Sequence, residues 1–173
     1  MASLRQLFDS LSREQRRNQD LLVSLAFAQR SFTNLNRFLE LVPVVAARLV
    51  GVQGAILVPF QSDGRLWREQ LQAVPAESSQ DLLQRLAAFE PGHGAGFGTD
   101  DDQLLLMDRL VQRLCPGAGL FATSVVARGR SRGRLYVFEP SGDLVWTDVH
   151  RRHVQLVADL AGGASETDQM LQE

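Results

Sequence analysis

The chain has 173 residues, 45% of them hydrophobic and 22% charged, so a single domain with a substantial core is expected rather than disorder. The net charge is −2 and all 18 basic residues are arginine, which disfavours nucleic acid and excludes lysine-dependent chemistry. A single cysteine, Cys115, excludes an intrachain disulfide and a thiolate metal cluster. Because neither a signal peptide nor a membrane-spanning apolar run is found, the sequence predicts a cytoplasmic protein with no membrane partner.

Two helices are expected at the start of the chain. Residues 3–31 contain no Gly or Pro, and their apolar residues recur at helical spacing. A second helix is expected over residues 34–50, where Pro43 should kink it or divide it and Gly51 should end it.

Strands and short helices are expected to follow. A strand over 54–60 and a second over 65–74 are separated by a Ser-Asp-Gly turn. Helices over 77–89 and 101–115 flank a Gly-rich loop, and two further strands, 120–129 and 134–140, are expected to turn at 130–133. The last helix should begin at Thr147 or Asp148 and weaken at Gly162 and Gly163. This order predicts an α+β fold, an antiparallel sheet with its terminal helices on one face.

The order of elements is similar to that of the GAF family, a relative of PAS domains, over residues 34–160. The segment SLSREQRRNQDLLVSLAFAQRSFTNLNRFLELVPVVAARLVGVQGAILVPF resembles the GAF module that precedes a PPM-type serine/threonine phosphatase domain in cyanobacterial proteins of the sporulation and stress-regulator class. The resemblance implies a GAF/PAS-like sheet with terminal helices on one face and a small-molecule pocket on the other. It also implies an effector domain further along the same chain.

Three parts and a regulatory function are therefore expected. Residues 1–33 would form a signalling and dimerisation helix, 34–161 the GAF domain, and 162–173 a linker to the effector. The expected function is that of a regulatory sensor and dimerisation domain that controls a serine/threonine phosphatase. The alternatives are a structural interaction module without a ligand and the input domain of a histidine kinase. No catalytic constellation is present, so the chain by itself is not expected to be an enzyme.

A small-molecule ligand is expected between the sheet and the Gly-rich loop, near Phe97, Thr123, Ser124 and Tyr136. The loop PGHGAGFG lacks the Lys-Ser/Thr ending of a phosphate loop and is interpreted as a pocket rim or a plain surface loop. Some GAF domains bind cyclic nucleotides through an Asn-Lys…Phe…Asp-Glu signature, and the missing lysine disfavours that ligand here. Covalent bilin attachment is disfavoured because Pro116, not His, follows Cys115, so no cofactor is expected.

Histidines and arginines near the end of the chain are weaker candidates. His150 and His153 share one helix face and could form half a metal site, but the adjacent Arg151 and Arg152 would repel a cation, so no metal is expected. Four arginines could contact an anion or an acidic partner, but they are interpreted as a solvated turn: Arg128, Arg130, Arg132 and Arg134.

The N-terminal helix carries a seven-residue repeat typical of a coiled coil. Its columns are Leu4, Leu11, Asn18, Leu25 and Phe32, and Leu7, Glu14, Leu21, Ala28 and Leu35. The repeat predicts a parallel homodimer in which Asn18 fixes the register. The residues assigned to dimerisation are Leu4, Leu7, Leu11, Asn18, Leu21 and Leu25. Packing of this face on its own domain is the alternative, and a four-helix bundle that adds the last helix of each chain would reconcile the two.

Overall fold

The structure, a computed structural model, describes residues 4–31, 34–59, 72–74, 77–88, 108–114, 119–139, 141–142 and 145–172. The helices are α1 (Leu4–Ser31), α2 (Leu35–Val50), α3 (Glu77–Ala88) and α5 (Asp148–Gln172). The strands are β1 (Gly54–Pro59), β2 (Gln72–Ala73), β3 (Gly119–Ala127) and β4 (Arg130–Glu139). Residues 108–114 are also helical.

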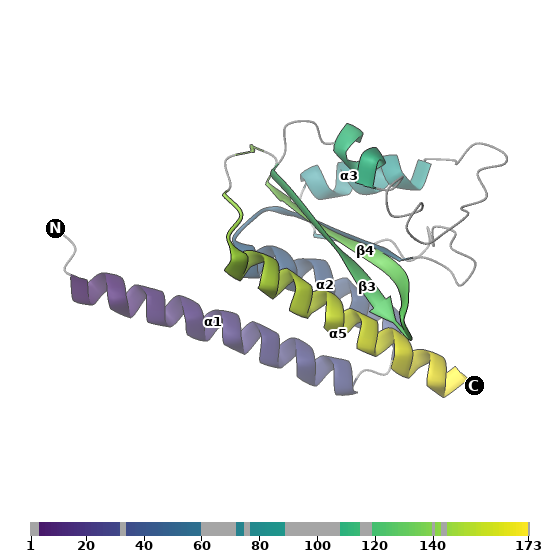
Figure 1. The fold of residues 1–173 in the computed structure, drawn as a ribbon, viewed down its shortest axis with the longest axis horizontal. Helices are drawn as coiled ribbons and strands as arrows, with labels where there is room; N and C mark the ends of the chain where they lie inside the picture. The colour runs from purple at the N-terminus through teal and green to yellow at the C-terminus, as the bar shows by residue number, and fades with distance from the viewer. Residues whose placement is uncertain are drawn as a thin grey trace.

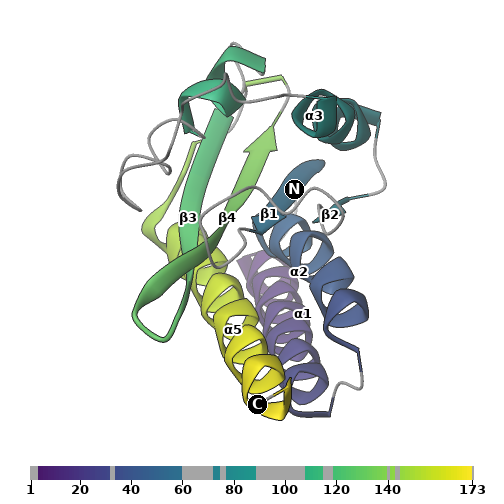
Figure 2. The ribbon, with the colours of Figure 1, turned by 90° about the vertical axis from the view of Figure 1, so that its right-hand side faces the viewer.

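The four described strands form one antiparallel sheet in the order β2-β1-β4-β3. Helices α1, α2 and α5 lie on one face of this sheet, whereas α3 lies on the other (Figures 1 and 2). Strand β1 is buried along its whole length because both of its faces are covered. The predicted α+β fold with its terminal helices on one face is confirmed.

The hairpin between β3 and β4 turns earlier than the sequence predicts. Arg128 and Gly129 form a two-residue turn in which both residues have positive φ, 52° and 74°. This is the backbone conformation that matches the twist of a tight hairpin. The predicted turn at 130–133 was wrong, because Gly133 lies inside β4, where a Cβ atom would stand only 2.8 Å from the carbonyl oxygen of Val58. A close approach between strands, and not a turn, requires this glycine.

The helix-covered face holds the larger core. Its centre is made of valines and alanines of α2 and α5 packed on Leu57, Leu135 and Val137 of the sheet. Helix α2 continues through Pro43, so this residue does not divide it. Helix α5 likewise continues past the predicted weak point to Gln172. A Cβ atom on Gly162 would lie 2.1 Å from the carbonyl oxygen of Val126, so this glycine permits close packing of α5 on β3.

A second core lies on the opposite face. Ile56 and Val58 of β1 and Phe138 of β4 contact Leu82 and Leu86 of α3. Residues 108–114 contribute to the same cluster through a buried valine. Of the described residues, α3 and segment 108–114 cover this face, whereas three helices cover the other.

Helix α1 divides into two halves with different surroundings. Its C-terminal half packs on the core through Leu25, which is 2% exposed. Its N-terminal half extends beyond the domain, and Leu4 and Leu7 are exposed (Figure 1). At 28 residues α1 is long enough to cross a bilayer, but it is not apolar enough. Within the described ranges, no helix is both long and apolar enough to span a membrane.

Several predictions fall on residues outside the described ranges. These are the Gly-rich loop with Phe97, most of the predicted strand over 65–74, Cys115, and the side chain of Leu11. The predicted helix over 101–115 is described only over residues 108–114.

Candidate functional site

The structure separates the residues predicted to bind a ligand. Thr123 and Ser124 are neighbours on β3, so their side chains point to opposite faces of the sheet. Thr123 is buried under α5, where its hydroxyl donates a hydrogen bond to the side-chain oxygen of Gln155. Ser124 and Tyr136 share the other face. One pocket therefore cannot contain all three residues, and Thr123 instead fixes α5 to the sheet.

Ser124 and Tyr136 belong to a polar group that we call the Arg134 cluster: Ser124, Arg134, Tyr136 and Asp108. The Arg134 guanidinium holds the Asp108 carboxylate through two parallel hydrogen bonds, from Nε to Oδ1 at 3.1 Å and from Nη2 to Oδ2 at 2.9 Å. The Tyr136 hydroxyl donates to Oδ1 of the same carboxylate at 2.7 Å. Nη1 of Arg134 donates to the Ser124 hydroxyl at 2.8 Å. Three donors from β4 therefore converge on one carboxylate.

The surroundings of Tyr136 fix the protonation state of its phenol. Burial, followed by the hydrogen bond to Asp108, raises the pKa of Tyr136 far above its ordinary value of 10. The phenol therefore remains a donor at every physiological pH. The side chains of Arg134 and Asp108 are 17% and 30% exposed, so the pair is partly shielded but still reaches solvent.

Sequence reasoning missed the two charged members of the Arg134 cluster. The interpretation of Arg134 as part of a solvated turn is wrong. Arg134 lies inside β4, and its side chain pairs with Asp108. A usable signal was present, since residues 134 and 136 alternate onto one strand face. Asp108 gave no signal of its own, because its partner lies 26 positions away and only the fold brings them together.

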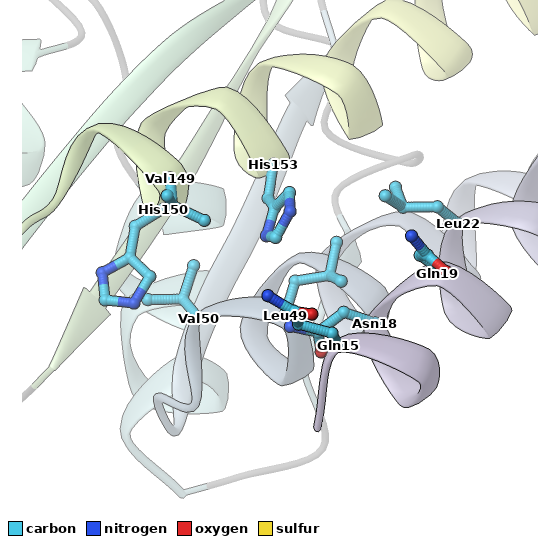
Figure 3. Close-up of a pocket in the computed structure, with 9 residues that line it drawn as sticks. All are labelled: Gln15, Asn18, Gln19, Leu22, Leu49, Val50, Val149, His150 and His153. Atoms are coloured by element: carbon cyan, nitrogen blue, oxygen red, sulfur yellow. The ribbon is translucent and has the colours of Figure 1, made fainter. Parts of the chain in front are cut away.

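A second candidate site is a groove between the helices on the opposite face of the sheet (Figure 3). Its volume is about 420 Å³. Helices α1, α2 and α5 all contribute to its lining, which consists of Gln15, Asn18, Gln19, Leu22, Leu49, Val50, Val149, His150 and His153. Amide and imidazole side chains thus stand where a helix seam ordinarily has apolar residues.

The two histidines of the groove have different roles. Thr147 caps α5 as predicted: its hydroxyl accepts a hydrogen bond from the His150 amide at 3.1 Å, and its own amide donates to Nδ1 of His150 at 3.5 Å. His153 points into the groove between α1 and α2 (Figure 3), and its Nδ1 is buried without a hydrogen-bond partner. Burial, with the nearby charges of His150 and Arg152, lowers the pKa of His153. Over the described ranges, no three His, Cys, Asp or Glu side chains are grouped to hold a metal ion.

The arrangement of sheet and helices is the GAF fold. Among solved structures, the chain is similar to the GAF domain of a protein from Pseudomonas syringae pv. tomato that is described as a sensor histidine kinase. The similarity covers 94% of each chain with a TM-score of 0.57 and 13% sequence identity. No protein-family model matches the sequence, and none of the curated proteins matches it. A likeness at this identity shows the fold, and the predicted GAF fold is thereby confirmed.

Proposed function

We propose that this chain is a regulatory sensor domain whose terminal helices, α1 and α5, carry a signal to an effector. The groove between these helices is the observation that carries the proposal. The helices run side by side in the same direction, with residues 15–22 near 149–153 and Gln29 against Gly163 (Figure 1). Their packing is close at one end and open at the other. Such a pair can change its relative angle without disrupting the core.

The polar part of the groove's lining lowers the free-energy cost of a small helix movement. An apolar seam resists opening because separation exposes its surface to water. Gln15, Asn18 and Gln19 lose no such burial when water enters, since their amides hydrogen-bond equally well to solvent. Shifts of only 1–2 Å between packed helices are a known means of switching an attached domain. We therefore propose that α1 and α5 move relative to one another at this end.

We also propose that two copies of the chain associate in parallel through the N-terminal half of α1. Leu4 and Leu7 belong to the predicted seam and are exposed. Two residues of the predicted seam must be corrected: Leu25 is buried in the core of its own domain, and Leu21 packs against that core. The alternative, that this face packs on its own domain, therefore describes the C-terminal half of α1. Among the described residues of the predicted seam, Leu4 and Leu7 at the start of α1 are the leucines that remain exposed to meet a partner.

Light scattering on purified protein tests the dimer. We expect a dimer at micromolar concentration for the wild type and a monomer for the Leu4→Glu, Leu7→Glu double variant, because paired glutamates would repel each other across the seam. Val145→Glu is a matched control, since Val145 is 84% exposed and Leu4 is 86% exposed. A monomeric wild type, or an equal effect of the control variant, would contradict the proposal.

The proposed effector is a serine/threonine phosphatase that would follow α5 in the same chain, and the end of α5, up to Gln172, would form a helical link to it. This proposal is supported by the resemblance of the N-terminal segment. A histidine kinase is the second candidate, and the similarity to the Pseudomonas domain favours it. The chain by itself should be inactive: a phosphopeptide assay with Mn²⁺ should stay at background. Turnover that a single acidic substitution abolishes would refute this expectation.

A structural module that binds no small molecule is the third candidate. It is favoured by the Arg134 cluster, in which the chain's own Asp108 accepts the hydrogen bonds of Arg134 and Tyr136 on the sheet face opposite α1, α2 and α5. Native mass spectrometry separates this candidate from a sensor, because a retained small molecule would exclude it.

A further inference from the structure

The Arg134 cluster is built from two parts that come from different regions of the chain. The donors stand on adjacent strands of the sheet: Arg134 and Tyr136 on β4, and Ser124 on β3. The acceptor, Asp108, is the first described residue of the helical segment 108–114. The sheet part stays in place through its backbone ladder whether or not the carboxylate is present.

The donors match a carboxylate in number and geometry. The planar guanidinium presents Nε and Nη2 to the two oxygens in parallel, and this fork is the arrangement with which arginine recognises carboxylates. Tyr136 adds a third hydrogen bond and cannot ionise in place. Ser124 accepts a hydrogen bond from Nη1 and so fixes the orientation of the guanidinium. Nothing in this set is specific for the side chain of an aspartate as opposed to another carboxylate.

The hydrogen-bond donors of Arg134 and Tyr136 require an acceptor. Withdrawal of Asp108 would leave Nε and Nη2 of the partly buried Arg134 and the buried Tyr136 phenol without an acceptor, which is strongly unfavourable. An incoming carboxylate would restore all three hydrogen bonds, so the exchange itself costs little. Because the edges of Arg134 and Asp108 keep some exposure, a small anion can approach them from solvent.

We propose that Arg134, Tyr136 and Ser124 form a binding site for a small carboxylate, which Asp108 occupies as an internal ligand until an external carboxylate replaces it. The replacement releases segment 108–114 from the sheet. This inference rests on the proposed sensor function, since the release would be the event that the domain senses. It explains how a sheet face filled by the chain's own side chains can still belong to a sensor.

The internal carboxylate sets the affinity of the external one. A tethered group competes at an effective concentration on the order of millimolar or above, so small carboxylates should bind the wild type weakly. Removal of the tethered group should strengthen binding by about tenfold or more.

The test uses the full chain and its Asp108→Ala variant, with sodium acetate and sodium formate as probes and sodium chloride at equal ionic strength as reference. We expect acetate and formate, but not chloride, to raise the melting temperature of Asp108→Ala in a saturable manner. The wild type should respond only at about tenfold higher concentration or above. Inorganic phosphate is a separate arm, and a stronger response to phosphate than to acetate would overturn the assignment to carboxylates.

Two controls make the result specific. Asp81→Ala also removes an ion-paired carboxylate, on the exposed side of α3, and should leave the acetate response unchanged. Arg134→Gln in the Asp108→Ala background should abolish the response. If Asp108→Ala does not fold, Asp108→Asn replaces it, because the amide keeps the shape and one acceptor oxygen.

The outcomes separate this inference from the function on which it rests. An acetate response no larger than that of chloride, or one that survives loss of Arg134, overturns the carboxylate site. A response confined to the variants, with no saturable change in the wild type, reduces Asp108 to a structural ion-pair partner and also overturns it. Neither result changes the oligomeric state measured by light scattering. The proposed dimer and the proposed helix movement are therefore tested independently of the carboxylate site.

Discussion

At the Gln29 end of the α1–α5 pair the two helices pack closely, whereas at the Gln15 end a groove separates them. The close end uses small residues on α5, including Ala161 and Ala164, and the buried Leu25 on α1. A Cβ atom on Gly163 would lie only 2.5 Å from the side-chain nitrogen of Gln29. The open end carries amides and imidazoles of larger size. The contrast teaches that side-chain size and polarity, within one helix pair, determine where the pair is rigid and where it can open.

The largest expected effect is at the close end, on replacement of Leu25. Leu25→Ala should lower the free energy of unfolding by about 3 kcal/mol, because a buried leucine leaves a cavity that its neighbours fill only in part. Urea denaturation measures the loss. The neighbouring Val23→Ala, on the exposed face of α1, should change stability by less than about 0.5 kcal/mol. Equal losses for the two variants would remove the distinction between core and solvent faces of α1.

The adjacent glycines of α5 give a second, smaller contrast. Gly162→Ala should cost about 1–3 kcal/mol, because its Cβ would collide with the backbone of Val126, which cannot move aside. Gly163→Ala meets only the flexible end of Gln29 and gains helix propensity, so its stability should lie within about 0.5 kcal/mol of the wild type or above it. Thermal unfolding of the two variants side by side checks the order. A reversed order would show that α5 does not rest on β3 as described.

At the open end, His153 should make stability depend on pH. Its pKa is lowered from 6.5 in the folded chain, so the unfolded chain takes up a proton first as the pH falls. The stability that His153 contributes is therefore fully present above about pH 6.5 and is lost as the pH falls through the folded pKa. Melting temperatures between pH 8 and pH 5 should fall less steeply for His153→Gln than for the wild type. Parallel profiles would show that the surroundings of the half-buried His153 do not lower its pKa.

The smallest expected effect concerns Asn18. If it lines the groove as described, Asn18→Leu should add apolar contact with Leu22 and Leu49 and raise stability by less than about 1 kcal/mol, without changing the oligomeric state. If Asn18 instead fixes the register of a dimer seam, the same change should alter the number of chains in the assembly. Light scattering and urea denaturation together distinguish the two roles.

Local sequence signals predicted most of the elements but not the surroundings of their side chains. Helical spacing in α1 and α3 and the continuous apolar run of β1 were sufficient, because both patterns report on residues close in the chain. The errors at Gly133 and Gly162 share one cause. A glycine indicates a turn or a helix end when only its neighbours in the sequence are considered. Both of these glycines instead lie where the backbone of a residue distant in the sequence packs too closely for a Cβ atom.

The sequence by itself determined the type and order of most elements and the amphipathic repeat of α1. These follow from hydrophobic periodicity, which is a local property of the chain. Only the tertiary structure decided which part of that repeat is buried, since this depends on which residues of α1 lie against the rest of the domain. It alone also joined Asp108 to Arg134 and opened a groove beside His153, because such contacts arise between residues that only the folded chain brings together.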